Sequence, residues 1–118
     1  MLKIKRIYEL PEKDDGFRVL VDRLWPRGIS KERAHLDLWL KEIAPSDALR
    51  KWFAHDPKRW TGFVAKYRKE LSGSKDLVKQ VRKLEADHDS VTLLYSAHDE
   101  LHNQAVALLQ ILKGSRSQ

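Results

Sequence analysis

The segment VLVDRLWPRG, residues 19–28, starts as an apolar run and continues with charged side chains. Asp22 and Arg23 follow the aliphatic residues directly, and Arg27 stands between a proline and a glycine. A guanidinium group offers a planar fork of donors that matches a phosphate or a carboxylate. The pattern therefore predicts an anion-binding site that contains both arginines, with Asp22 as a candidate catalytic group. The structural alternative is that Asp22 pairs with one of the arginines and fixes a loop.

A second polar segment, YSAHDE at residues 95–100, follows another apolar run. We expect it to begin a helix, whose free backbone N–H groups and dipole would favour an anion. Tyr95, Ser96 and His98 are candidate ligand-binding residues in this segment, and Asn103 is a further one. Histidine is the side chain best suited to proton transfer at physiological pH, so His98 is either a general acid or base, or an ordinary surface histidine.

The segment APSDALRKWFAHDP, residues 44–57, supplies further candidates. Ser46 and Arg50 are candidate ligand-binding residues, and His55 is a candidate catalytic acid or base beside them. The apolar residues that follow Ser46 have the spacing of a helix. This serine is therefore also the expected N-cap of that helix. Asp56 is the expected N-cap of the next helix because a proline follows it, and proline is favoured at the first helical position.

Histidine and aspartate also recur in a way that admits a metal site as an alternative. His98 and His102 would lie one turn apart on a helix, but the spacing fixes no third ligand. Asp99 is equally well explained as a helix cap. We therefore assign no metal and no other cofactor. The residues that the metal alternative would use are His55, Asp56, His98, Asp99 and His102.

Length and composition limit the classes of protein to which this chain can belong. A chain of 118 residues with 42% hydrophobic and 34% charged residues is typical of one globular domain. No apolar run is long enough to span a membrane, and the N-terminal residues do not resemble a signal peptide. The absence of cysteine excludes disulfides and thiol catalysis. We therefore expect a soluble cytoplasmic protein that does not associate with membranes.

Three apolar runs, at residues 2–8, 17–23 and 91–96, predict strands, and the last is apolar enough to be central in a sheet. Helical periodicity fills most of the chain between the second and third strands, which are far enough apart to be parallel. The orientation of the first strand stays open. The connection at residues 9–16 permits either an antiparallel pair with the second strand or a parallel arrangement with an extended link.

These elements predict an α/β fold: a single small domain, residues 1–113, with a short, mostly parallel sheet of about three strands surrounded by helices. One further helix is expected after Ser74 as its N-cap and another over about residues 99–113. Gly114 is the expected stop of the last helix, and residues 114–118 are the expected flexible C-terminal tail. Ligands in such folds bind beyond the carboxyl ends of the strands, so the polar segments should meet at one edge.

Several motifs in this order resemble the YeaO-like bacterial proteins, part of a larger family catalogued as a domain of unknown function (family four-eight-eight). The matching motifs are DRLWPRG, APS…LR.WF.HDP and LLY.A.D…N.A, and the resemblance runs from about residue 3 to residue 112. It implies a small cytoplasmic α/β protein and supplies no activity. Many family members carry lysine at the position of His98, which shifts the acid–base role toward His55. The shared polar residues that it implies are Asp22, Arg23, Arg27, Ser46, Arg50, His55, Asp56, Tyr95 and Asn103.

Three functions compete at this point. The leading hypothesis is a cleft that binds a phosphorylated small molecule or a nucleotide, with or without catalysis. A nucleic-acid-binding accessory protein is the second, because the formal net charge is +6, although acidic residues are spread evenly among the basic ones. A protein-interaction module is the third, because the helices that follow Ser46 and Asp56 are rich in tryptophan. The oligomeric state stays open.

Overall fold

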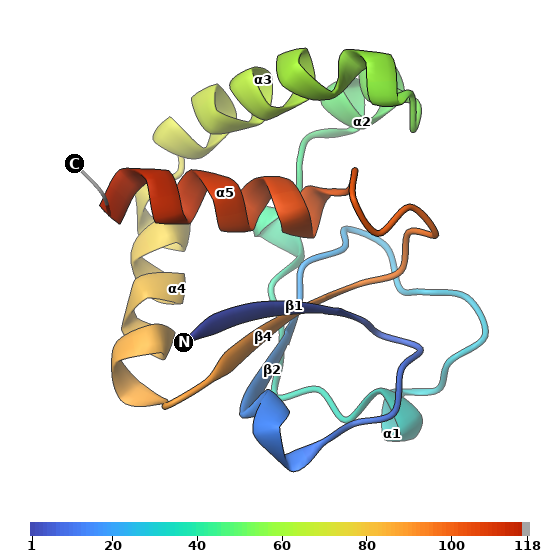
Figure 1. Ribbon diagram of the computed structural model, residues 1–118, viewed down its shortest axis with the longest axis vertical. Helices are drawn as coiled ribbons and strands as arrows, with labels where there is room; N and C mark the ends of the chain where they lie inside the picture. Colours follow the sequence, from blue (N-terminus) through green and yellow to red (C-terminus); the bar gives the residue numbers. More distant parts are fainter. Residues whose placement is uncertain (117–118) are drawn as a thin grey trace.

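The strands of the protein are β1 (Leu2–Arg6), β2 (Phe17–Leu20), β3 (Leu38–Trp39) and β4 (Val91–Tyr95). Figure 1 shows them in a computed structural model that describes the backbone of residues 1–116 and the side chains of residues 1–114. They form one sheet in the order β1-β4-β2-β3, and every neighbouring pair is parallel. The predicted α/β fold with a short parallel sheet is confirmed, and β3 is an additional edge strand.

Helical segments connect the strands. None of the helices in the described part of the chain is both long enough and apolar enough to cross a lipid bilayer. The α-helices and the shorter 3-10 helices, written η, are α1 (Lys31–Ala34), α2 (Asp47–Phe53), α3 (Trp60–Ser72), α4 (Lys75–Asp87), α5 (Gln104–Arg116), η1 (Lys13–Asp15), η2 (Lys41–Ile43) and η3 (Pro57–Arg59).

The first two strands are not neighbours in the sheet. β1 and β2 pair with opposite edges of β4, whose residues are all buried. They are therefore parallel to each other, and the antiparallel pair that the sequence left open does not form. Their connection, residues 7–16, ends at Gly16, which has a φ of 65°. A Cβ on Gly16 would lie 2.2 Å from the Ser90 carbonyl oxygen, so only glycine fits at this approach.

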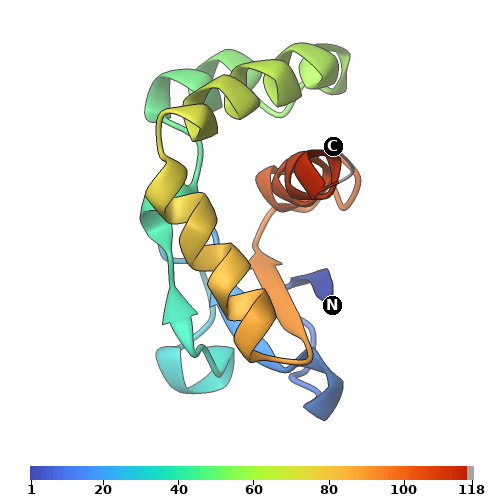
Figure 2. The same cartoon turned by 90° about the vertical axis from the view of Figure 1, so that its left-hand side faces the viewer.

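Alternating side chains of the sheet pack into two separate apolar layers. On one face, residues such as Val19 and Leu93 pack against residues from α2, α3, α4 and α5. On the other face, Leu20 and Leu94 pack against the segment 25–39, in which α1 is the single α-helix. Figure 2 shows α4 running across the front, with α5 seen end-on beside it and α3 above. The long helices thus cover one face of the sheet, and a loop-rich segment covers the other.

A network of buried charges lies on the loop-covered face. Asp15 and Arg18, each 4% exposed, form an ion pair. The ammonium of Lys5 lies 3.1 Å from Oδ1 of Asp15, and the Thr92 hydroxyl donates to the Asp15 carbonyl at 2.6 Å. Burial alone would raise the pKa of Asp15, but hydrogen bonds from the Glu12 N–H and from both cations hold it below the ordinary 3.8. The network fixes the β1–β2 connection to the sheet.

The three predicted N-cap residues all stand at the start of a helix, and two of them make the capping hydrogen bond. The Ser46 hydroxyl accepts from the Leu49 N–H at 3.1 Å and caps α2. The Asp56 carboxylate accepts from the Lys58 N–H at 3.0 Å and caps η3, which leads directly into α3. Ser74 stands at the N-cap position of α4, but its side chain makes no capping hydrogen bond.

The last helix begins and ends later than predicted. α5 does not start near Asp99, because Asn103 is its N-cap and accepts, through its side-chain oxygen, a backbone N–H three residues later at 3.0 Å. At the other end, α5 passes through Gly114, which therefore does not stop it. The predicted tail, residues 114–118, is helical up to residue 116. Residues 117 and 118 lie outside the described residues.

The tryptophan of α2 is only partly buried. Phe53 beside it is 5% exposed, whereas 37% of Trp52 is exposed. Its ring tip instead meets α3 at Gly62, where a Cβ would lie only 2.8 Å from Cη2. The Arg59 guanidinium and the Lys66 ammonium lie 5.3 Å and 4.9 Å from the ring centroid, within cation–π range. Close packing of the Trp52 ring therefore explains why a glycine stands inside α3.

Removing the Asp15 carboxylate is expected to destabilise the fold strongly. Asp15→Ala leaves the buried Arg18 without its partner, so the free energy of unfolding should fall by about 3 kcal/mol. Urea denaturation measures this change. The neighbouring Asp14 is exposed, so Asp14→Ala is the matched control and should change stability by less than about 0.5 kcal/mol. Equal effects of the two substitutions would contradict the structural role of the network.

Gly62→Ala should change stability differently in the natural sequence and in a variant that lacks the Trp52 ring. An alanine inside a helix normally gains up to about 1 kcal/mol over glycine, but here its Cβ would collide with the Trp52 ring. We expect no gain, or a loss, in the natural sequence and a gain of about 1 kcal/mol in the Trp52→Ala background. A double-mutant cycle of urea denaturation curves measures the difference. Identical effects in both backgrounds would show that the close approach does not constrain this position.

Candidate functional site

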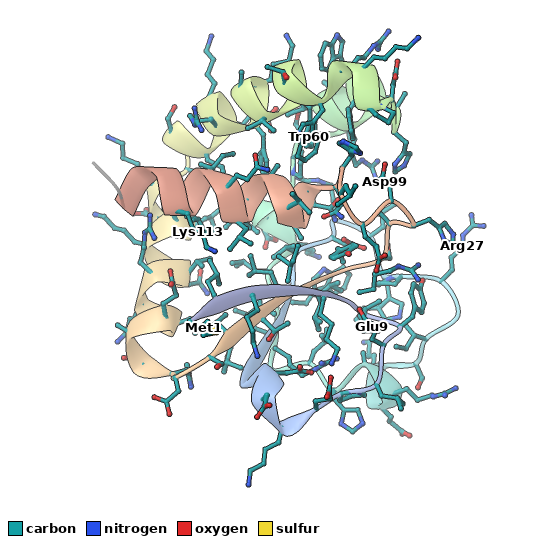
Figure 3. The ribbon with its side chains drawn as sticks, viewed as in Figure 1. Met1, Glu9, Arg27, Trp60, Asp99 and Lys113 are labelled. Carbon is teal, nitrogen blue, oxygen red and sulfur yellow. The ribbon has the colours of Figure 1, made fainter. Side chains whose placement is uncertain are left out.

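A cleft of about 400 Å³ lies at the carboxyl edge of the sheet. It is bounded by the segments after β2 and β4, by the loop that follows α2 and by the start of α5. This is the edge expected for a ligand, because the chain leaves the parallel strands β2 and β4 on the same side. Figure 3 labels Trp60, Asp99 and Arg27 on this side of the molecule. The predicted site residues that line the cleft are Asp22, Arg23, Arg27, Arg50, His55, Ser96, His98 and Asn103.

Asp22 links β2, β4 and α5 at the base of the cleft. Its Oδ2 accepts from the Ser96 N–H at 3.1 Å and from the Ser96 hydroxyl at 2.5 Å, and its Oδ1 accepts from the Gln104 amide. It forms no ion pair with Arg23 or Arg27, so the structural alternative, in which Asp22 pairs with one of these arginines, is not what the structure shows. Burial raises the pKa of Asp22, against the opposing effect of these hydrogen bonds and of the nearby Arg50 charge.

Arg23 is anchored by backbone carbonyls. Its Nη2 donates to the Ala44 carbonyl at 2.9 Å and its Nε donates to the Pro45 carbonyl at 3.2 Å. Arg6 at the end of β1 does the same for the loop after β4, where it donates at 2.9 Å to the carbonyls of both Ser96 and Ala97. The two guanidinium groups therefore fix the loops that shape the cleft. Within the described residues, Nη1 of Arg23 has no hydrogen-bond acceptor.

Arg27 and Arg50 lie at the rim with exposed side chains. The position of Arg27 is set through its backbone, because its carbonyl accepts from the Tyr8 hydroxyl at 2.6 Å. Its guanidinium has no carboxylate partner in the described part of the chain. Arg50 pairs with Asp47 at 3.1 Å, and both side chains are largely exposed. Exposed pairs of this kind contribute little, so Arg50 remains available to a stronger anion.

His55 stands at the rim in an unusual backbone conformation. It and the preceding Ala54 have φ values of 55° and 48°, in the left-handed region that non-glycine residues rarely adopt. The two left-handed residues end α2 and turn the chain into η3, which places His55 against the cleft. The exposed imidazole lies 6.4 Å from the Phe53 ring, centroid to centroid. A strained conformation at a cleft is typical of functional positions.

His98 belongs to a loop and not to a helix. The carboxylate of Asp99 accepts from the backbone N–H groups of Leu101 and His102 at 2.9 and 3.0 Å, so it caps the turn that precedes α5. Its other oxygen lies 3.0 Å from Nδ1 of His102, whose ring meets Trp60 edge-on. The predicted spacing of His98 and His102 by one helical turn is therefore wrong. No three His, Asp or Glu side chains among the described residues converge as metal ligands.

Ser46 and Tyr95 do not line the cleft. The Ser46 hydroxyl donates to the Glu70 carboxylate at 2.6 Å, which joins α2 to α3. Tyr95 is 3% exposed, and burial, together with nearby acidic charges, raises its pKa. The Asn103 side chain, which lines the cleft, donates to the Asp99 carbonyl at 2.9 Å and caps α5. Ser46 and Tyr95 thus support the walls from behind.

Several cleft residues were not predicted from the sequence. Tyr8 reaches the cleft from the segment after β1, which carries no motif of its own. Gln104 lies in the first turn of α5. The sequence predicted that this helix starts near Asp99, which would place Gln104 in the helix interior and not at the cleft. His102, which the sequence offered only for a metal site, also lines the cleft. The other walls are apolar side chains with no chemical signal in the sequence. They include Leu24, Trp25, Pro26, Phe53 and Phe63.

A family model described as "Inactive DUF488-N3 subclade" matches residues 1–118. The chain belongs to this family. The uncharacterized protein YeaO of Escherichia coli is 41% identical over 112 residues, which cover 95% of this chain and 96% of YeaO. An uncharacterized protein of Mycobacterium tuberculosis, Rv3073c, is 39% identical over 113 residues, covering 96% of this chain and 94% of the relative. No solved structure gives a significant match. The YeaO-like resemblance is confirmed.

The raised pKa of Asp22 predicts a specific dependence of stability on pH. The folded protein holds the Asp22 proton more tightly than the unfolded chain, so this residue's contribution falls as pH rises from 3.8 through the raised pKa. Asp22→Asn removes the titration, and its stability relative to the natural protein should therefore increase over this pH range. Urea denaturation at a series of pH values measures the difference, with the exposed Asp14→Asn as control. A constant difference across the range would contradict the assignment.

Proposed function

We propose that the cleft binds a small phosphorylated molecule or a nucleotide. The observation that carries this proposal is the distribution of charge. Arg27, Arg50, His55 and His98 present exposed side chains at its edge, and Nη1 of Arg23 is available behind them. Guanidinium and imidazole groups in this arrangement favour a phosphate that approaches from solvent.

The carboxylate of the cleft should repel a bound anion only weakly. Among the described residues that line the cleft, Asp22 carries the single carboxylate. Its two oxygens already accept hydrogen bonds from Ser96 and Gln104, and Arg50 compensates part of its charge. Asp22 therefore acts as a structural support in this proposal, and the anion contacts the cations at the rim.

The size and walls of the cleft suit a small organic ligand better than a bare ion. Its volume of about 400 Å³ falls within the range of small-molecule sites. Apolar side chains such as Leu24, Trp25 and Pro26 provide a surface for a sugar or a base beside the cationic rim. Phosphorylated metabolites and nucleotides of this size are abundant in the cytoplasm, the compartment in which we propose that the protein acts.

The family description supports binding without turnover. The matching model describes an inactive subclade, and the carboxylate of Asp22 has both oxygens occupied by internal donors. In this proposal His55 donates a hydrogen bond to the bound phosphate. Its predicted role in proton transfer, with Asp22 as second catalytic group, stays a prediction that a turnover assay with each bound ligand would test.

Arg27→Ala should remove ligand binding and leave the fold intact. Thermal unfolding would be followed with inorganic phosphate, ribose 5-phosphate and AMP at fixed moderate salt. A ligand at about 100 times its Kd stabilises by about 2.7 kcal/mol, which raises the Tm of a domain of this size by about 10 °C. We expect such a shift for the natural protein and none for Arg27→Ala.

Arg33→Ala is the matched control for this experiment. Arg33 is an exposed arginine of α1 that does not line the cleft, so its loss changes the net charge equally. This variant should keep the full ligand-induced shift. The proposal fails if no phosphorylated ligand raises the Tm of the natural protein, or if the two variants lose the shift to the same extent.

A further inference from the structure

A second groove lies on the helical side of the molecule, formed by α3, α4 and α5. Its volume is about 400 Å³, and its lining shares no residue with the cleft at the sheet edge. Figure 2 faces this side, with α4 in front, the end of α3 above it and α5 end-on beside it. The groove is therefore a separate candidate site, independent of the proposed function.

The floor of the groove is apolar. It consists of Leu71 from α3, Val78 from α4, and Ile111 and Leu112 from α5. Leu71, Ile111 and Leu112 belong to the main core and are at most 5% exposed, so the core itself reaches the surface here. Val78 is only partly buried and packs against the same core. An alkyl chain laid on this floor would extend the packing of the core outward.

The rim of the groove is cationic. Arg68, Lys75, Lys79 and Arg82 surround the floor, and no described carboxylate lines it. Arg82 has a structural role, because its Nη2 donates to the Leu112 carbonyl at 2.7 Å and ties α4 to α5. The other three side chains are exposed and form no hydrogen bond or ion pair within the described residues.

Repulsion between cations on α4 destabilises this helix when no anion is bound. Lys75 and Lys79 are four residues apart, and like charges at this spacing destabilise a helix. Arg82 continues the same face of α4 one turn later. Arg82 is already paired with Glu85, at 3.6 Å. An anion held between Lys75 and Lys79 would remove the repulsion between these two side chains. Charge and apolar surface together therefore point to one kind of occupant, a molecule with an anionic head and an apolar body.

We propose that this groove binds a free medium-chain fatty acid. The alkyl chain lies on Leu71, Val78, Ile111 and Leu112, and the carboxylate lies among Arg68, Lys75 and Lys79. The small volume suits a single chain of this length rather than a whole phospholipid. The groove differs from the cleft in that no described carboxylate or amide side chain lines it, whereas Asp22, Asn103 and Gln104 line the cleft.

Calorimetric titration with decanoate tests the proposal on the full chain. We expect saturable binding of one decanoate, about tenfold weaker binding of octanoate because two fewer CH₂ groups are buried, and no binding of decyltrimethylammonium. Lys79→Glu should weaken decanoate about fivefold or more through loss of the cation. Val78→Thr, which keeps the shape of the side chain and adds a hydroxyl to the floor, should weaken it as well.

Lys69→Glu is the matched control, because Lys69 is exposed on α3 and does not line the groove. It should bind decanoate like the natural protein. The proposal is overturned if decanoate does not bind, if decyltrimethylammonium binds equally well, or if Lys69→Glu and Lys79→Glu weaken binding to the same extent. Binding to vesicles of anionic phospholipid without binding of decanoate would also overturn it and would identify a membrane surface as the partner.

Discussion

The carboxylate of Asp22 is the interaction on which the carboxyl edge of the sheet depends. It accepts hydrogen bonds from Ser96 and Gln104, which follow it by more than seventy residues in the sequence. The backbone carbonyl of the same residue accepts from the Trp39 indole at 2.7 Å. One buried residue therefore holds the ends of β2 and β4, the strand β3 and the first turn of α5 in a fixed relation. Burying its charge is costly, and the complete set of donors offsets that cost.

The arginines near this edge divide into two groups with different physical roles. Arg6 and Arg23 donate to backbone carbonyls that the ends of β4 and η2 would otherwise leave unpaired. Arg27 and Arg50 are exposed, and neither side chain donates a hydrogen bond to a buried group within the described residues. The shape of the cleft and its affinity for an anion therefore depend on separate residues, which allows the rim to vary while the loops keep their positions.

Sequence patterns predicted the elements whose signal is local. Apolar runs located β1, β2 and β4, helical periodicity located α3 and α4, and the caps at Ser46 and Asp56 follow from side chains next to the helix they begin. The prediction for the start of α5 was wrong because two side chains close in sequence both act as caps: Asp99 caps a turn, and Asn103 caps the helix. Other contacts could not be predicted because they join distant parts of the chain. The partners of Asp22 and the contact between Trp52 and Gly62 join separate segments, which no local pattern encodes.

The place of β4 in the sheet has a consequence for how the chain folds. β1 pairs with β4 and with no other strand, although β1 is near the start of the chain and β4 covers Val91–Tyr95. During synthesis, the first strand must therefore remain unpaired until most of the chain has left the ribosome. β2 and β3 can pair early, but the central position between β1 and β2 is empty until the end. Such long-range closure slows folding, and it leaves both β1 and the β4-facing edge of β2 open to other strands until β4 has been made.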